Sequence, residues 1–204
     1  MDIQPNDALL IIDPQIDFCP GGALAVKDGH AIMKGIAELA KDFKHVIISQ
    51  DWHPADHASF ASTQGVEPFN TMTMFYGEQT LWPDHCVAGT PGADFHPDVI
   101  PAVNAASLII RKGMNRFVDS YSAFFENDHE TSTGLRGFLY EKKIKRIFIV
   151  GLAYDFCVAF SALDAVQHTN MDVFVLRNLT RAIDLNGSAD EQTRIMELAG
   201  VQIV

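Results

Sequence analysis

The sequence predicts an α/β protein built on a six-stranded, mostly parallel sheet. Short apolar runs alternate along the chain with stretches that have helical spacing, which is typical of strand–helix–strand units. These runs are apolar at nearly every position, as expected for strands whose two faces are both covered. A chain of 204 residues, 48% of them hydrophobic, can bury a sizeable core. We therefore expect residues 1–204 to form a single domain.

The first half of the chain contains two apolar runs with a helical stretch between them. Residues 8–12 read Ala-Leu-Leu-Ile-Ile and residues 45–50 read His-Val-Ile-Ile-Ser-Gln, so both are predicted strands. Residues 29–43 place apolar side chains on one face at three- and four-residue steps, which predicts an amphipathic helix. These side chains are Ile32, Ile36, Leu39 and Ala40.

The second half of the chain continues the alternation. Its apolar runs again have the length of strands, and longer stretches of helical character separate them. We expect further strands at 107–111, 145–151, 172–177 and 201–204, and helices at 133–142, 156–169 and 188–199.

One segment, residues 54–106, interrupts this rhythm because it contains no convincing strand or long helix. It includes the turn-rich stretch 89–94, Gly-Thr-Pro-Gly-Ala-Asp. A long irregular excursion inside a compact domain is usually functional. We interpret it as a lid that folds back over the strand ends and completes a metal site, not as a second domain.

Composition and charge exclude several classes of protein. The net charge of −11 gives no support for nucleic-acid binding, which requires a basic face. No apolar run approaches the roughly 20 residues of a membrane helix, and the first residues do not resemble a signal peptide. Cys19, Cys86 and Cys157 are odd in number and widely spaced, so they do not form a disulfide framework. We expect a reduced, cytoplasmic protein.

A candidate metal site follows the strand at 45–50. Asp51 and His53 are two residues apart, so an extended segment directs both side chains to the same side. His57 follows in the same loop, and His85 lies further along the chain. A carboxylate and neutral imidazoles are ordinary ligands of divalent transition metals, and this set suits zinc, iron or manganese.

Three reactive side chains lie at the ends of other predicted strands. Asp13 follows the first strand, Lys112 follows the run at 107–111, and Cys157 lies just past the run at 145–151. Ligands of parallel α/β sheets bind at the carboxyl ends of the strands. A thiol, a carboxylate and an ammonium at that edge are the components of covalent amide chemistry. We expect the ammonium and a helix amino terminus to stabilise the Cys157 thiolate.

Four segments resemble the motifs of the nicotinamidases (pyrazinamidases), a family of isochorismatase-like cysteine hydrolases. They read Ile-Asp-Pro-Gln-Ile-Asp-Phe at 12–18, Asp-Trp-His-Pro at 51–54, Trp-Pro-Asp-His-Cys-Val at 82–87 and Gly-Leu-Ala-Tyr-Asp-Phe-Cys-Val at 151–158. The resemblance implies a three-layer α/β/α fold and one divalent metal ion. It also implies hydrolysis of nicotinamide to nicotinate and ammonia, and of pyrazinamide to pyrazinoate, in NAD salvage.

The resemblance also implies residue roles. Cys157 corresponds to a nucleophile that forms a thioester, Asp13 to its base and Lys112 to an orienting cation. The backbone N–H groups of Ala153 and Cys157 correspond to an oxyanion hole, next to a cis peptide between Leu152 and Ala153. The metal ligands that we expect are Asp51, His53 and His85, with His57 either a further ligand or a residue that orients one.

An aromatic pocket for the pyridine ring completes the implied site. Phe18 and Trp82 are expected to flank the ring, and Tyr121, Leu152, Ala153 and Phe156 to line the rest. Two of the neighbouring positions depart from the family pattern or vary within it. Tyr154 stands where the family more often has a small residue, and Phe156 occupies a variable position, so both bear on substrate range.

Three alternatives remain at the level of sequence. The chain could be an isochorismatase-like hydrolase of another small amide, or a metal-dependent pyridine-binding protein without turnover. It could also be a metallohydrolase in which Cys157 is only structural. The metal cluster disfavours the first, and the set of Cys157, Asp13 and Lys112 disfavours a pure binding protein.

Overall fold

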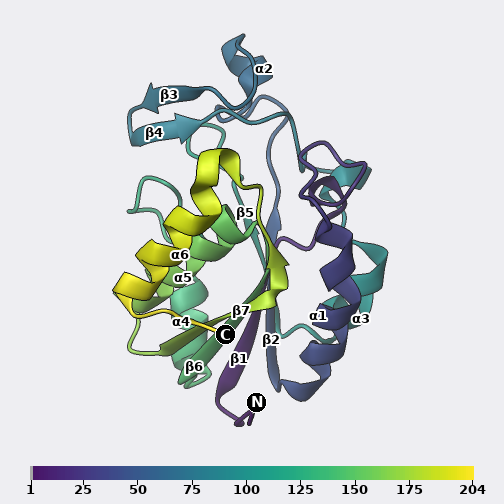
Figure 1. The fold of residues 1–204 in the computed structure, drawn as a ribbon, viewed down its shortest axis with the longest axis vertical. Helices are drawn as coiled ribbons and strands as arrows, with labels where there is room; N and C mark the ends of the chain where they lie inside the picture. Colours follow the sequence, from purple (N-terminus) through teal and green to yellow (C-terminus); the bar gives the residue numbers. More distant parts are fainter. Residues whose placement is uncertain (1) are drawn as a thin grey trace.

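A six-stranded parallel sheet forms the middle layer of the computed structural model, which describes residues 2–204 (Figure 1). Helices cover both faces, so the predicted three-layer α/β/α class is confirmed. The strands are β1 (Asp7–Ile12), β2 (His45–Asp51), β5 (Leu108–Lys112), β6 (Arg146–Leu152), β7 (Asp172–Arg181) and β8 (Gln202–Ile203).

The two outer layers are helical. In Figure 1, α1 (Met33–Leu39) and α3 (Ile100–Ala105) lie on one face of the sheet. The other face is covered by α4 (Leu135–Glu141), α5 (Ala159–His168) and α6 (Ser188–Ala199). Within residues 2–204, no helix has the length and apolar character needed to cross a membrane.

The strand order is β5-β2-β1-β6-β7-β8, with every neighbouring pair parallel. From β1 the chain first builds β2 and β5 on one side and then crosses to β6 on the other. The order therefore reverses between β1 and β6, and a ligand crevice is expected at their carboxyl ends.

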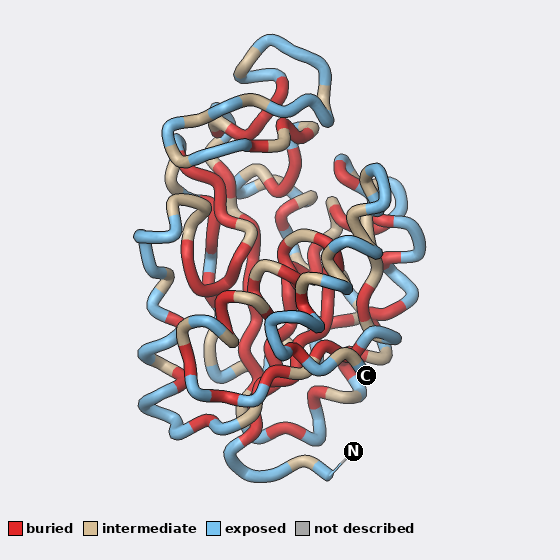
Figure 2. Tube along the Cα trace, turned by 60° about the vertical axis from the view of Figure 1, so that its left-hand side comes forward, coloured by how far each residue is buried: buried red, intermediate tan, exposed pale blue. Residues whose placement is uncertain are grey.

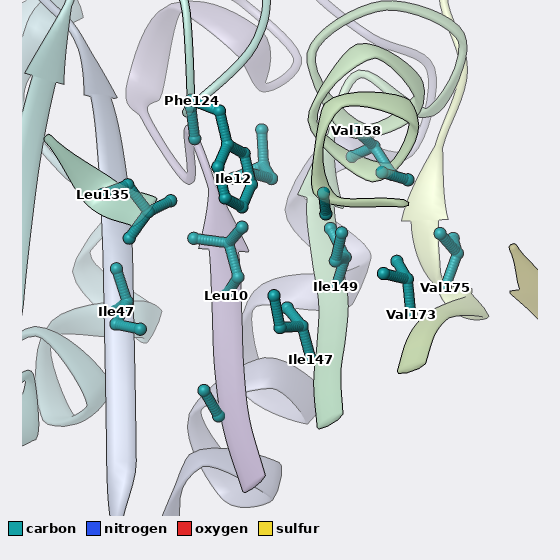
Figure 3. Close-up of a cluster of buried hydrophobic side chains, with 14 of the residues drawn as sticks. Leu10, Ile12, Ile47, Phe124, Leu135, Ile147, Ile149, Val158, Val173 and Val175 are labelled. Carbon is teal, nitrogen blue, oxygen red and sulfur yellow. The ribbon is translucent and has the colours of Figure 1, made fainter. Parts of the chain in front are cut away.

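Alternating side chains of β1 supply two separate cores. Leu10 and Ile12 face α4 and α5 and pack with Ile147 and Ile149 of β6, as Figure 3 shows. Leu9 belongs to the opposite cluster, beneath α1 and α3. Burial of both faces explains the almost uninterrupted apolar runs of the strands. Figure 2 shows the resulting concentration of buried chain at the centre of the molecule.

Two expectations about secondary structure were only partly met. The helix expected at 29–43 is divided into a 3-10 turn (Gly29–Ile32), α1 and a second 3-10 turn (Ala40–Asp42). Segment 54–106 is also more regular than expected. It contains α2 (Ala61–Gln64), α3, and an antiparallel hairpin of β3 (Thr71–Met74) and β4 (Gly77–Thr80).

The hairpin and α3 lack the sequence patterns from which strands and helices are predicted. The hairpin strands are mostly exposed and polar, so they lack the apolar run that identifies the strands of the main sheet. Proline at the start of α3 reads as a helix breaker, although the first helical turn tolerates it. Short 3-10 turns and a five-residue π-turn account for the remaining helical residues. They are Ile16–Phe18, Pro91–Ala93, Pro97–Val99, Tyr154–Val158 and Leu185–Gly187.

Gly151 is a position where β6 requires the absence of a side chain. Its φ is +112°, and a Cβ there would lie 2.1 Å from the Ile12 carbonyl oxygen of β1. We expect Gly151→Ala to lower the free energy of unfolding by about 2–4 kcal/mol, through backbone strain and overpacking. Gly137 is the matched control, because it is exposed in α4 and has open space around it. Gly137→Ala should raise stability by about 0.5–1 kcal/mol. Urea denaturation measures both, and equal midpoints for Gly151→Ala and wild type would contradict the argument.

Candidate active site

The carboxyl ends of β1, β5 and β6 bring Asp13, Lys112 and Cys157 to one buried point. The exposed fractions of these residues are 0%, 2% and 7%. The Lys112 Nζ atom lies 2.9 Å from Asp13 Oδ2 and 3.5 Å from Cys157 Sγ. A carboxylate oxygen of Asp13 and the Cys157 sulfur are within 4.8 Å of each other. The three residues that the sequence singled out are therefore in mutual contact range.

Lys112 also contacts Asp51, the first of the expected metal ligands. Its ammonium forms an ion pair with Asp51 Oδ1 and donates to the Ser120 carbonyl oxygen at 2.8 Å. Burial alone would lower the pKa of Lys112, but the two carboxylates outweigh burial and hold that pKa well above its usual range. The side chain is therefore a permanent cation that joins the cysteine to the metal-ligand group.

Asp13 has one satisfied and one available carboxylate oxygen. Oδ1 accepts a hydrogen bond from Ser49 Oγ at 2.7 Å. Within residues 2–204, Oδ2 accepts no well-aligned hydrogen bond, although the Lys112 ammonium is close to it. Burial raises the pKa of Asp13 to about 6, against the opposing effect of Lys112. Asp13 is thus ionised at neutral pH and has a free lone pair for the thiol proton.

The Cys157 thiol differs from the sequence expectation in its charge. Burial raises the pKa of Cys157 well above the ordinary value, and Asp13 and Asp51 raise it further, while Lys112 lowers it. Lys112 acts on the thiol in the expected direction, but desolvation outweighs the ammonium, which favours the thiol over the thiolate in the free protein. Cys157 is held as a neutral thiol and needs a base in order to react.

The segment that carries Cys157 is anchored by the side chain of Asp155. Cys157 lies in the π-turn Tyr154–Val158, which follows a cis peptide between Leu152 and Ala153. The buried carboxylate of Asp155 accepts hydrogen bonds from Ile183 N at 3.0 Å and from Asp184 N at 2.7 Å. These bonds connect the turn to the chain that follows β7.

The expected metal ligands form a compact second group beside Lys112. Asp51 Oδ2 lies 3.6 Å from His53 Nε2 and 3.8 Å from His85 Nε2. The loop that carries His85 is attached to the end of β2, since His53 N donates to Cys86 O at 3.1 Å and Ala88 N donates to His53 O at 2.8 Å. One oxygen and two nitrogens therefore face a common point.

The hydrogen bonds of the two imidazoles prepare them for a divalent ion. His53 Nδ1 donates to Gly113 O at 2.9 Å, and His85 Nδ1 donates to Pro83 O at 2.8 Å. Carbonyl oxygens only accept, so in the neutral rings the Nε2 lone pairs are directed toward Asp51. Burial lowers the pKa of His85 to about 4, so this ring is neutral at pH 7. The donor set thus fits a divalent transition metal.

His57 lies outside this group of three. Its Nδ1 is 2.7 Å from Ser59 Oγ, and its ring centroid is 4.4 Å from that of His53. It forms a different potential ligand group with His53 and Asp119, without Asp51 and His85. The structure therefore favours a supporting position for His57, behind His53.

A cavity reaches both groups, at Cys157 and at Asp51 and His85. Five of the expected pocket residues line it, together with Asp51, His85 and Cys157. These five are Phe18, Trp82, Tyr121, Ala153 and Phe156. The Trp82 and Phe156 rings meet edge to face with centroids 4.8 Å apart. The lining is therefore mainly aromatic and apolar, with the polar side chains of Asp51, His85, Asp119 and Cys157 among it.

The pocket differs from expectation at several positions. Leu152 does not line it and instead packs in the core beneath α1. Tyr154 does not line it either, and its hydroxyl lies 2.6 Å from Thr193 Oγ1. Three lining residues were missed, all in segments without a recognisable motif: Leu24, Asp119 and Ile183. For Asp119, the only signal was its position two residues before Tyr121.

Comparisons with known proteins agree on one family. The isochorismatase domain model matches residues 7–204. A nicotinamidase of Acinetobacter baylyi is 47% identical over 97% of this chain and 91% of its own length. A solved Acinetobacter baumanii nicotinamidase/pyrazinamidase superposes with a TM-score of 0.96 at 46% identity, over 100% of this chain and 97% of that one. The pyrazinamidase of Pyrococcus horikoshii in complex with zinc has a TM-score of 0.76 at 32% identity, over 98% and 99%.

The donor geometry predicts metal content. We expect protein purified without chelators to carry about one divalent ion per chain, and His85→Ala to lose most of it, because three protein ligands become two. His57→Ala should keep its metal, as should His30→Ala, a control at an exposed position. Inductively coupled plasma mass spectrometry measures the content. Wild-type metal content in His85→Ala would refute the assignment of His85 as a ligand.

Proposed function

The chain belongs to the isochorismatase family, and from this premise we propose that it hydrolyses nicotinamide to nicotinate and ammonia. Pyrazinamide is expected to be hydrolysed likewise to pyrazinoate. The observation that carries the proposal is the buried group of Asp13, Lys112 and Cys157, whose cysteine lines a mainly aromatic cavity. The similarity to named nicotinamidases over nearly the whole chain supports the same reaction.

The first half of the reaction forms a thioester. Cys157 Sγ attacks the carboxamide carbon while Asp13 accepts the thiol proton. Negative charge develops on the carboxamide oxygen, and we assign the backbone N–H groups of Ala153 and Cys157 to its stabilisation. Asp13 then donates its proton to the amide nitrogen, and the carbon–nitrogen bond breaks to release ammonia. Lys112 keeps Asp13 close to the sulfur throughout and compensates the charge of the two carboxylates.

The second half regenerates the thiol. Asp13, again ionised, removes a proton from a water molecule that attacks the thioester carbon. The carbon–sulfur bond breaks, the sulfur recovers its proton from Asp13, and nicotinic acid leaves, losing its carboxyl proton to solvent to become nicotinate. One water is consumed in each cycle, and the protein returns to its starting protonation state.

The ring is held by the aromatic wall and the metal group. Phe18 and Trp82 flank it, with Tyr121, Ala153 and Phe156 around them. A divalent ion held by Asp51, His53 and His85 would bind the pyridine nitrogen, orient the ring and withdraw electrons from it. Zinc, iron and manganese all suit these donors, and zinc is supported by the Pyrococcus horikoshii complex.

We assign the protein to NAD salvage, in which nicotinate is reused, and to the cytoplasm. The three cysteines, Cys19, Cys86 and Cys157, are all free thiols, which favours a reducing compartment.

Replacement of the nucleophile tests the proposal directly. We expect Cys157→Ala to release no ammonia from nicotinamide, yet to bind it within about tenfold of wild type, or ~1.4 kcal/mol. Cys19→Ala, outside the cavity, is the matched control and should retain activity. Substantial turnover by Cys157→Ala would indicate a metallohydrolase, and binding without turnover by wild type would indicate a pyridine-binding protein. Coupled ammonia assays and calorimetry distinguish these outcomes.

The pKa of Asp13 predicts the acid limb of the pH profile. Burial raises this pKa to about 6, so Asp13 is protonated below that pH and cannot accept the thiol proton. We expect kcat/KM to fall about tenfold per pH unit below pH 6 and to be nearly flat just above it. Metal content must be measured at each pH, because acid also protonates metal ligands. A profile that stays flat to pH 4.5 with bound metal would exclude Asp13 as the base.

A further inference from the structure

We propose that Gln79, in the hairpin of β3 and β4, is a positioning residue that fixes the cavity wall formed by Asp119 and Tyr121 and thereby sets the affinity for the pyridine substrate. This inference rests on the proposed nicotinamide hydrolysis. No motif of the sequence pointed to Gln79, and the reaction steps above do not use it.

Gln79 is the point at which the hairpin is attached to the body of the protein. Of the eight strand residues of the hairpin, all of them described, only Gln79 is buried, with 0% exposure. The hairpin extends beyond the carboxyl ends of the sheet strands in Figure 1. A two-stranded hairpin is marginally stable on its own in water, so its attachment depends on contacts with neighbouring segments. In this hairpin the buried contact is made by the polar side chain of Gln79.

The Gln79 side chain is fully engaged in hydrogen bonds. Its Nε2 group donates to Asp119 Oδ2 at 2.8 Å and lies 2.9 Å from the Tyr121 hydroxyl and 2.7 Å from Thr80 O. Its Oε1 atom accepts from the Tyr76 hydroxyl and from Asn127 Nδ2, both at 3.1 Å. The orientation of the amide is settled by chemistry, because a carboxylate such as Asp119 only accepts.

Two of these partners belong to the wall of the cavity. Asp119 and Tyr121 both line it, on the loop that follows β5. The Tyr121 hydroxyl also accepts from Trp82 Nε1 at 3.1 Å, and the Tyr121 ring meets Phe156 edge to face at 5.6 Å. Gln79 therefore holds two side chains on one side of the ring site and, through Tyr121, the orientation of Trp82.

The hydrogen bonds of Gln79 predict which kinetic constant it controls. Its partners lie in the hairpin or in the loop 113–134, whereas Asp13, Lys112 and Cys157 are held mainly by one another and by the strand ends, with the Ser120 carbonyl as the contact of Lys112 with that loop. Displacement of the wall removes contacts that substrate and transition state share. When substrate and transition state lose the same binding energy, KM increases and kcat is retained.

The decisive variant is Gln79→Glu, which preserves shape but places a second carboxylate against Asp119. We expect KM for nicotinamide to rise about tenfold or more, since a buried bond to a charged group becomes a repulsion, with kcat within about threefold. In the double variant, Gln79→Glu with Asp119→Asn, an amide again faces a carboxylate. One hydrogen-bond donor and one acceptor are thereby restored, with the two positions exchanged. Its KM should fall at least about threefold from that of the single variant.

Glu78→Gln provides the control, because Glu78 is the exposed neighbour on the same strand and lies outside the cavity. Its KM should match that of wild type. Melting temperature and active-site titration are measured for every variant. A purely structural role would reduce the melting temperature or the active fraction and leave KM unchanged, and that result would overturn the proposal. A double variant with no lower KM than Gln79→Glu would overturn it as well.

Failure of the proposed function has a different signature. Wild-type protein that releases no ammonia from nicotinamide overturns the hydrolysis, and calorimetric titration with nicotinamide then replaces KM by Kd. A Kd raised about tenfold in Gln79→Glu alone would still support the role of Gln79. Equal Kd values for Gln79→Glu and wild type, or no binding of nicotinamide by wild type, would contradict the role of Gln79.

Discussion

The buried ammonium of Lys112 is the interaction on which the site depends. A buried charge is tolerable only with partners, and Lys112 pairs with the carboxylates of Asp13 and Asp51 and donates to the Ser120 carbonyl. Asp51 and Lys112 are register partners on adjacent strands, and Asp13 follows the next strand of the sheet. The parallel sheet thus places one cation between two carboxylates. Because Asp51 also faces His53 and His85, the same ion pair connects the thiol with the metal-ligand group.

Burial gives Cys157 and Asp13 different protonation states at neutral pH. It raises the pKa of Cys157 far enough to keep the thiol neutral, and it raises the pKa of Asp13 only to about 6, because Lys112 opposes it. A protected thiol and an ionised base therefore coexist in one dry site at neutral pH. The proton acceptor is therefore already in position beside the thiol.

The substrate cavity is assembled from segments outside the sheet. Trp82 and His85 come from the excursion between β2 and β5, and Asp119 and Tyr121 come from the loop after β5. Polar side chains hold these segments to one another: Gln79 ties the hairpin to Asp119, and Asp155 ties the Cys157 turn to Ile183. The reactive groups are therefore positioned by the sheet, and the shape of the ring site by buried hydrogen bonds between loops.

The sequence by itself determined the six strands, the layer architecture and the residues at the strand ends, because strand runs buried on both faces are apolar and the carboxyl ends of parallel strands share one edge. Only the tertiary structure decided the neutral state of Cys157, the positions of Leu152 and Tyr154 outside the cavity, and the contribution of Asp119 and Ile183 to it. It also revealed the hairpin and Gln79. These features depend on desolvation and on contacts between residues distant in the chain, and neither leaves a periodic pattern in the local sequence.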